Sequence, residues 1–347
     1  MTKTENTAHL KQDPTAVSRK KDHIELAFKS AVSAAEVDGR FYYEPLLCGH
    51  PDDKTIPVTD FLSHKLNLPI WVSSMTGGTE WALTINTNLA KACGEYGMGM
   101  GLGSCRALLM ENDRLNEFAV KKHMPNQPLY ANLGIAQIEE LVIANKLKDI
   151  NSLVDKLDAD GLIIHINPLQ EWLQPEGDRY YQSPIELIKR VIDACPDLSI
   201  IVKEVGQGFG PKSIQALYEL PIAAVDFAAS GGTNFALLEL LRSSADQQQA
   251  HEGLAKVGHS AYDMVHLTNS VLKSMLGTEK CKQTIISGGV GNFLDGYHLT
   301  QKLSGQAIYG QASSFLKYAR DSYELLQQHV ERQRAGLQVA YAFLTVK

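Results

Sequence analysis

The stretch GLIIHINPLQEW, residues 161–172, decides the fold. A short run of branched apolar residues bounded by Gly161 and Pro168 is typical of a β-strand that is buried on both faces. From His165 and Asn167 onward, polar side chains replace the apolar ones. A dense polar cluster at the carboxyl end of a parallel strand is typical of the active site of an α/β barrel. The stretch therefore predicts one strand of such a barrel, with a functional site at its end.

Seven further segments share the pattern of a short buried strand. They lie at 69–75, 98–103, 128–134, 198–205, 223–229, 284–287 and 307–310. Helical patterns follow several of them, at about 82–97, 136–148 and 183–195. Strands that alternate with helices favour a parallel sheet, and eight strands favour a closed barrel. We therefore predict an α/β fold, a (β/α)₈ TIM barrel with a short N-terminal extension.

The length agrees with one large domain. A barrel of this class takes about 250 residues before additions, and the chain has 347. Its hydrophobic content of 44% and charged content of 21% are ordinary for a globular protein that buries a sizeable core. Residues 1–18 are polar and predict a flexible N-terminal tail. The expected organisation is thus this tail followed by a single barrel domain, 19–347.

The tail leads into a charged run at 19–23. Such a run is more often the solvated start of a helix than a binding site. Apolar residues then recur at helical spacing on one face, namely Ile24, Ala27, Phe28 and Ala31. The pattern predicts an amphipathic helix over 23–37.

Charge and cysteine usage exclude several classes of protein. The net charge of −6 argues against a general nucleic-acid binder, which is usually basic. The five cysteines are odd in number and form no C-x-x-C pair, so neither a disulfide framework nor a zinc site is indicated. Neither an apolar leader nor a run of about 18 apolar residues occurs. We expect a cytoplasmic protein with no membrane partner and no nucleic-acid partner.

Three glycine clusters follow predicted strands, at 77–78, 231–232 and 288–291. Glycines at such turns let backbone N–H groups approach a phosphate. For a single cluster, a tight turn without a ligand is the more frequent interpretation. Three clusters on one barrel rim favour a phosphorylated cofactor. Sequences of the type G-x-G-x-x-G, H-E-x-x-H and G-x-S-x-G are all absent, so Rossmann, zinc hydrolase and serine hydrolase interpretations lose support.

Seven motifs together resemble one family. They are RKxxHI at 19–24, SMTGG at 74–78, GSxR at 103–106, NxG at 132–134, HxNxxQE with PEGD at 165–178, VKEVG at 202–206 and GGT at 231–233. Their order and spacing resemble those of the type 2 isopentenyl diphosphate isomerases from about residue 19 to beyond 315. The resemblance implies an FMN-dependent barrel that interconverts isopentenyl and dimethylallyl diphosphate by a 1,3-allylic proton shift. It implies reduced FMN, Mg²⁺ on the diphosphate, NADPH as the reductant, and a homo-oligomer, a tetramer or larger.

The resemblance also implies roles for single residues. Catalytic roles are implied for Gln170, Lys203 and His165. Substrate contacts are implied for Arg19, Lys20, His23, His165, Asn167 and Gln170. Flavin contacts are implied for Met75, Thr76, Gly77, Ser104, Asn132, Lys203, Thr233, Gly288 and Gly289. Glu171 is implied as the ligand of Mg²⁺.

The reaction explains why these residue types are needed. Moving a double bond in a diphosphate ester requires a cationic clamp at the anionic end, which Arg, Lys and His beside a metal provide. The positive charge of Lys203 would favour an anionic reduced flavin. If the loop after the fourth strand is extended, Gln170 and Glu171 point to opposite sides, one to the carbon skeleton and one to the metal.

Each assignment has a structural alternative. His165 is also consistent with a satisfied core histidine, and Lys203 with a strand-end ion pair to Glu204. For Glu176, Asp178 and Arg179, bracing of the loop is the preferred interpretation over catalysis.

The chain departs from the family pattern at four places. Cys105 replaces a usual Gln, Ala228-Ala229 a usual Ser-Gly, Gly291 a basic residue, and Phe293 a glycine. Both of the last two lie at the phosphate end of the flavin site, where Gly291 removes the usual cation and backbone N–H groups are left to compensate. Two other functions remain as alternatives: an FMN-dependent 2-hydroxy-acid oxidase or dehydrogenase, and a catalytically silent flavin-binding protein. The first usually carries a His-Gly-Gly-Arg type segment, and none follows the seventh strand here.

Overall fold

The computed structural model describes residues 15–74 and 80–347. The chain divides into two compact units, one reaching to Tyr42 and including Lys347, the other spanning residues 43–346. The first contains the helix α1 (Ala16–Leu26) and the short 3₁₀ turn η1 (Ala34–Glu36), and β1 (Phe41–Tyr43) begins in it. The predicted boundary at residue 18 is not tested by this division and stays a prediction.

The helix predicted over 23–37 is wrong in its bounds, because α1 ends at Leu26. Within the predicted helix, a separate turn starts at Ser33. The Glu36 carboxylate accepts hydrogen bonds from the backbone N–H and the hydroxyl of Ser33. A side chain that caps a new turn competes with continuation of the preceding helix. The predicted apolar face is exposed in this unit, with Ile24 at 74% and Phe28 at 93%.

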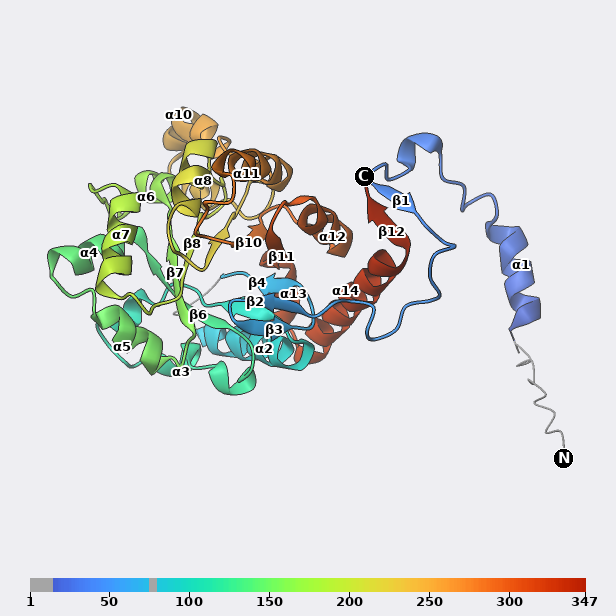
Figure 1. Cartoon of the computed structure of the whole chain (residues 1–347), viewed down its shortest axis with the longest axis horizontal. Coiled ribbons are helices and arrows are strands. Elements are labelled where there is room, and N and C mark those ends of the chain that lie inside the picture. The colour runs from blue at the N-terminus through green and yellow to red at the C-terminus, as the bar shows by residue number, and fades with distance from the viewer. Residues whose placement is uncertain (1–14, 75–79) are drawn as a thin grey trace. The chain divides into compact units, whose positions relative to one another are not determined.

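The second unit is built on a closed barrel of eight parallel strands, which confirms the predicted fold (Figure 1). The strands are β4 (Ile70–Val72), β5 (Gly99–Gly101), β6 (Leu129–Gly134), β7 (Gly161–His165), β8 (Ile200–Lys203), β9 (Ala224–Asp226), β10 (Gln283–Ser287) and β11 (Gln306–Gln311). They pair in chain order, and β11 closes the ring by pairing with β4. All eight predicted strands therefore occur, although most are shorter than predicted.

Helices surround the barrel in Figure 1. They are α2 (Glu80–Tyr96), α3 (Leu115–Phe118), α4 (Ile135–Ile143), α5 (Asp149–Lys156), α6 (Pro168–Leu173), α7 (Pro184–Ala194), α8 (Pro211–Tyr218), α9 (Phe235–Arg242), α10 (Ala245–Ala255), α11 (Ala261–Met275), α12 (Phe293–Lys302), α13 (Ser313–Ala319) and α14 (Tyr323–Phe343), the last leading into β12 (Leu344–Val346). The helix predicted over 136–148 ends early, because Asn145 adopts a left-handed φ of +56° after α4. In the part of the chain that the structure describes, none of the helices combines the length and the apolar character needed to span a bilayer.

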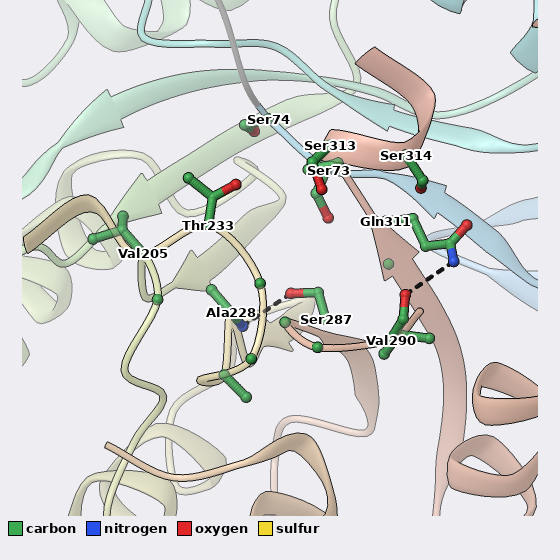
Figure 2. A pocket seen from close by; sticks show the side chains of 18 of the residues that line it. Ser73, Ser74, Val205, Ala228, Thr233, Ser287, Val290, Gln311, Ser313 and Ser314 are labelled. Carbon is green, nitrogen blue, oxygen red and sulfur yellow. Dashed lines mark hydrogen bonds between the residues drawn. The ribbon is translucent and has the colours of Figure 1, made fainter. Parts of the chain in front are cut away.

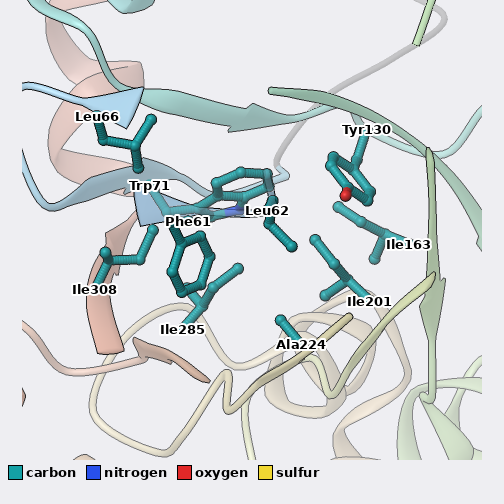
Figure 3. Close-up of a cluster of buried hydrophobic side chains, with 10 residues drawn as sticks. All are labelled: Phe61, Leu62, Leu66, Trp71, Tyr130, Ile163, Ile201, Ala224, Ile285 and Ile308. Atoms are coloured by element: carbon teal, nitrogen blue, oxygen red, sulfur yellow. The ribbon is translucent and has the colours of Figure 1, made fainter. Parts of the chain in front are cut away.

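A hairpin closes the amino end of the barrel. Its strands β2 (Thr59–Phe61) and β3 (His64–Leu66) are joined by Leu62 and Ser63, both with positive φ, as a two-residue hairpin turn requires. The Leu62 N–H donates a hydrogen bond of 2.9 Å to Oε1 of Gln283, the first residue of β10. Apolar side chains of the hairpin pack against those inside the barrel (Figure 3): Phe61, Leu62, Leu66, Trp71, Tyr130, Ile163, Ile201, Ala224, Ile285 and Ile308. The amino end is therefore filled, and the carboxyl end is left for a site.

Candidate functional site

A cavity of about 380 Å³, which we name the glycine cavity, lies at the carboxyl end of the barrel. Its walls are the loops after β8, β9, β10 and β11, together with Ser73 and Ser74 after β4 (Figure 2). Small-molecule sites typically enclose about 300–1,000 Å³. Four predicted flavin contacts line this cavity: Lys203, Thr233, Gly288 and Gly289.

The two glycine turns in this wall pack backbone against backbone. Gly231 has a φ of +114° and Gly288 a φ of +87°. A Cβ atom at Gly288 would lie 2.0 Å from the carbonyl oxygen of Ala229, and one at Gly231 would lie 3.0 Å from Cα of Gly289. Both the conformation and the space therefore require glycine. Because these positions are glycines, the two turns present backbone groups and no side chains to the cavity wall.

Two serine hydroxyls point to a polar ligand. The Oγ atoms of Ser73 and Ser74 are buried and have no hydrogen-bond partner within residues 15–74 and 80–347. An unsatisfied buried hydroxyl costs about 1–3 kcal/mol. Because both serines line the glycine cavity, a polar ligand bound there could supply the missing partners.

A smaller cavity of about 140 Å³, which we name the histidine cavity, adjoins the first. Both cavities are lined by Ser74, Lys203, Val205 and Phe235. The other residues of the smaller one are Gly103, Ser104, Asn132, His165 and Gln170. The structure thus brings together predicted site residues from six strands, β5 to β10, or from the segments that follow them, with Lys203 at the boundary between the two cavities.

Lys203 is buried at the end of β8, and its Nζ donates a hydrogen bond of 2.7 Å to the carbonyl oxygen of Glu204. Its register partner on β9 is Asp226, which is completely buried. One carboxylate oxygen of Asp226 accepts a hydrogen bond from the Ser287 hydroxyl. Burial raises the pKa of Asp226, and the charge of Lys203 opposes that rise. Asp226 was not among the predicted site residues. The sequence indicates it only as a carboxylate within an otherwise apolar strand segment.

Glu204 does not form the strand-end ion pair with Lys203 that the sequence left open. Its Oε2 instead accepts hydrogen bonds of 2.6–3.1 Å from four successive backbone N–H groups, those of Val205, Gly206, Gln207 and Gly208. A buried carboxylate that collects several N–H groups fixes the backbone around it. Glu204 therefore holds the loop after β8 in the shape that places Val205 and Gly206 in the cavity wall.

His165 is held as a neutral imidazole with a defined tautomer. The Asn132 Nδ2 donates to the carbonyl oxygen of Leu102 at 2.9 Å, so its Oδ1 faces the ring and lies 2.8 Å from His165 Nδ1. Since this oxygen only accepts, Nδ1 carries the proton and Nε2 is left as an acceptor. Burial, aided by the charge of Lys203, lowers the pKa of His165 to about 3. The sequence predicted a group of cations around the anionic end of the substrate. Because His165 is neutral, it can contribute there only as a hydrogen-bonding group.

Replacing His165 with glutamine should weaken the pH dependence of stability. The folded pKa of about 3 lies below the ordinary value of 6.5, so as the pH falls the unfolded chain takes up the proton first. The stability that neutral His165 contributes is complete above pH 6.5 and is lost as the pH falls toward 3. Urea unfolding at pH 7 and pH 5 should show the parent losing about 1–2 kcal/mol more than His165→Gln. The same pH dependence in both proteins would contradict a depressed pKa.

Gln170 and Glu171 lie on the helix α6. The prediction that their side chains point to opposite sides assumed an extended loop, and that loop does not occur. Pro168 at the first helical position favours a helix start here. Asn167 Nδ2 donates to Oε1 of Gln170 at 3.1 Å and to Oε1 of Glu171 at 2.7 Å. Both side chains are therefore oriented by one amide. Gln170 lines the histidine cavity, whereas Glu171 does not.

Asp178 and Arg179 brace this helix, as the sequence favoured, and bracing by Glu176 stays a prediction. The backbone N–H of Asp178 donates to Oε2 of Glu171 at 2.7 Å. The Asp178 carboxylate pairs with Arg106 and accepts a hydrogen bond of 3.1 Å from Gln137 Nε2. Arg179 donates to the carbonyl oxygen of Glu171. These contacts join the loops after β5, β6 and β7.

The remaining predicted residues are placed as follows. Arg19, Lys20 and His23 are exposed on α1 in the first unit, and their role toward a substrate stays a prediction. The predicted flavin contacts Met75, Thr76 and Gly77 lie outside the described residues. Cys105 is completely buried and lines neither cavity. Burial raises the pKa of its thiol to about 12, so it is protonated at neutral pH and suited to packing only.

No group of three or more His, Cys, Asp and Glu side chains that could hold a metal ion occurs in residues 15–74 and 80–347. Mg²⁺ needs no such group, because it often takes only one or two protein carboxylates and completes its shell with substrate phosphates and water. Glu171 stays the predicted ligand.

No model of a known protein family matches the chain. It is 35% identical over 329 residues to the isopentenyl-diphosphate delta-isomerase of Rickettsia africae (strain ESF-5), covering 93% of this chain and 92% of that one. It is 32% identical over 325 residues to the enzyme of the same name from Rickettsia typhi (strain ATCC VR-144 / Wilmington), with the same coverage.

Among solved structures, the fold is similar to a mandelate oxidase variant with a monooxide FMN adduct, at a TM-score of 0.54 and 13% identity over 89% of this chain and 88% of that chain. It is also similar to the flavin-binding domain of baker's yeast flavocytochrome b2, at a TM-score of 0.56 and 14% identity over 87% and 71%. At these identities the likeness shows the fold alone.

Proposed function

The chain belongs to the isopentenyl-diphosphate delta-isomerase family, and on this premise we propose that it interconverts isopentenyl and dimethylallyl diphosphate with reduced FMN and Mg²⁺. The observation that carries the proposal is the pair of adjoining cavities with Lys203 on their shared wall. One cavity suits a cofactor and the other the carbon skeleton of a small substrate.

The residues of the glycine cavity fit FMN. A phosphorylated, hydrogen-bonding cofactor suits a cavity of about 380 Å³ with bare glycine turns and two unsatisfied serine hydroxyls. Lys203, Thr233, Gly288 and Gly289 would hold it. When bound, reduced FMN supplies a group that can give and accept a proton and can stabilise positive charge beside it. The charge of Lys203 would favour the anionic form of that group.

The histidine cavity fits the five-carbon part of the substrate. A dry cavity of about 150 Å³ can hold a benzene molecule, and this one measures about 140 Å³. Neutral His165 offers an acceptor nitrogen without placing a positive charge next to a reacting group of cationic character. The Gln170 amide adds a second oriented polar group in the same wall.

The diphosphate and its Mg²⁺ would lie on the side of α6 where Glu171 stands. Its carboxylate already accepts two hydrogen bonds, from Asn167 and Asp178, and each oxygen keeps a lone pair for a cation. Arg19, Lys20 and His23 are proposed as further contacts to this anionic end. Reduction by NADPH and assembly into a homo-oligomer stay predictions.

A hydroxy-acid oxidase, the main alternative, is supported only by the likeness of folds. The loop after β10 is Gly-Gly-Val-Gly, and it carries neither the histidine nor the arginine of the usual His-Gly-Gly-Arg type segment. The family relationship therefore outweighs the alternative.

Two linked measurements test the proposal. After reconstitution, the purified chain should carry about one FMN per chain in its absorbance spectrum. An anaerobic assay with FMN, Mg²⁺ and a reductant should then convert isopentenyl diphosphate, because only the reduced ring is a good proton donor. A chain that takes up no flavin would remove the proposal, and equal rates with oxidised and reduced FMN would remove the reduced cofactor from the mechanism.

A further inference from the structure

The glycine cavity has two chemically different ends. One end adjoins the histidine cavity and includes Lys203, Val205 and Phe235. Residues that line the glycine cavity alone include the turn at 288–291 and the start of α13 with the two residues before it (Figure 2). Since the reacting part of a cofactor must face the substrate, its other part must lie toward this second end.

The lining of the glycine cavity carries positive charge and no negative charge. Its charged side chains in the described part of the chain are Lys203 and Lys317, and no aspartate or glutamate lines it. Lys203 already faces the buried Asp226 across the two strands. Lys317, by contrast, takes part in no ion pair within residues 15–74 and 80–347, and its Nζ lies 5.5 Å from the centre of the Tyr318 ring. Lys317 is therefore available to an anion.

Two further hydroxyl groups, those of Ser313 and Ser314, line the glycine cavity (Figure 2). Lys317 lines the same cavity. The turn opposite them is fastened to β11, because Gln311 Nε2 donates to the carbonyl oxygen of Val290 at 3.0 Å. Gln311 is held in turn by Gln333 Nε2, which donates to its Oε1 at 2.8 Å. The hydroxyls and the glycine turn thus belong to one connected wall.

The turn itself cannot supply the cation that a phosphate needs. Gly291 has no side chain, and the Asp295 carboxylate lies 3.3 Å from the position its Cβ would take. A phosphate monoester carries about −1.5 to −2 charges at neutral pH. A cation in the cavity wall would offset this charge.

We propose that Lys317, with the hydroxyls of Ser313 and Ser314, binds the phosphate group of the flavin and so replaces the basic residue that is missing at Gly291. The inference rests on the proposed function, because it requires a flavin in the glycine cavity. Lys317 contributes the charge and the serines contribute oriented hydroxyl donors. The site is consequently selective for FMN over riboflavin, which has the same ring and no phosphate.

The test compares the dissociation constants of oxidised FMN and riboflavin, measured by flavin fluorescence with the full-length chain. Lys317→Gln should weaken FMN binding about 10- to 100-fold, the effect of one charge-assisted hydrogen bond, and leave riboflavin binding within about twofold. Lys317→Arg should restore most of the FMN affinity. Added salt should weaken FMN binding to the parent more than riboflavin binding, because charge attraction is screened.

Arg320→Gln is the matched control. This variant removes a positive charge three residues after Lys317. Arg320 Nε lies 3.6 Å from Asp321 Oδ1, and Arg320 lines neither the glycine cavity nor the histidine cavity. It should leave both dissociation constants within about twofold. Circular dichroism of each variant confirms that the exposed substitutions leave the fold intact.

The outcomes separate this inference from the proposed function. If the parent binds neither flavin, the proposed function fails. If the parent binds both flavins equally, or if Lys317→Gln leaves FMN binding unchanged, the flavin site stands and Lys317 does not hold the phosphate. If Lys317→Gln weakens both flavins equally, or if the Arg320→Gln control weakens FMN as much, the effect is not phosphate recognition and the inference is overturned.

Discussion

Gln170→Ala is expected to lower kcat about 10²- to 10⁴-fold, the range for a group that assists proton transfer, while KM changes only a few-fold. Gln170 lines the histidine cavity, and its Oε1 is held at 3.1 Å by Asn167 Nδ2, which fixes the amide in the wall. An interaction made mainly in the transition state lowers kcat and kcat/KM together when it is removed. Steady-state kinetics with the FMN-loaded enzyme measure both constants.

Gln174→Ala is the control for that variant. Gln174 follows α6 one turn after Gln170 and lines neither cavity. The same truncation there should leave kcat within about twofold, and both variants should retain FMN. A Gln170→Ala enzyme as fast as the parent would remove Gln170 from the mechanism.

Glu171→Gln should raise the Mg²⁺ concentration for half-maximal activity about tenfold or more and should raise KM for the diphosphate. Mg²⁺ prefers a charged carboxylate oxygen, and the amide that replaces it keeps the size of the side chain but not its charge. A loss of 10- to 100-fold in metal affinity is also the approximate cost of disturbing the groups that orient a metal ligand. The measurement is a Mg²⁺ titration of steady-state rates, with flavin content checked by absorbance.

This variant also disturbs the loop, because Glu171 Oε2 accepts the backbone N–H of Asp178. Asp178→Asn controls for that effect, since it weakens the pairing of the loop with Arg106 and leaves the Glu171 carboxylate in place. The control should alter KM without shifting the Mg²⁺ dependence. An unchanged Mg²⁺ dependence in Glu171→Gln would rule out the metal assignment.

Local patterns in the sequence were sufficient for the barrel. Each strand is a short buried segment whose apolar residues are neighbours in the chain, as in residues 161–164, so its burial can be recognised without knowledge of its partners. The same holds for the polar groups that follow these strands. Parallel strands of a closed barrel bring their carboxyl ends to one rim, so His165, Lys203 and Gly288 were expected to converge.

Helix ends were less predictable, because they depend on single competing contacts. Apolar spacing continues past Leu26, yet the Ser33–Glu36 hydrogen bonds start a new turn. Likewise, α6 replaces the extended loop assumed for Gln170 and Glu171, since Pro168 favours a helix start within a run too short to show helical periodicity.

The sequence by itself determined the eight strands, their order and the residue types gathered at one rim, because these follow from short-range patterns and from the closure of a parallel barrel. Only the tertiary structure decided which groups face each other there. Strand register pairs Lys203 with Asp226, and Asn132 Oδ1, which accepts a hydrogen bond from Nδ1 of His165, fixes the tautomer of His165. Gly231 packs against Gly289, and Lys317 lies in the wall of the cavity that both glycines line, so loops far apart in the chain are joined there. Contacts over such separations depend on how whole loops pack, which no local pattern encodes.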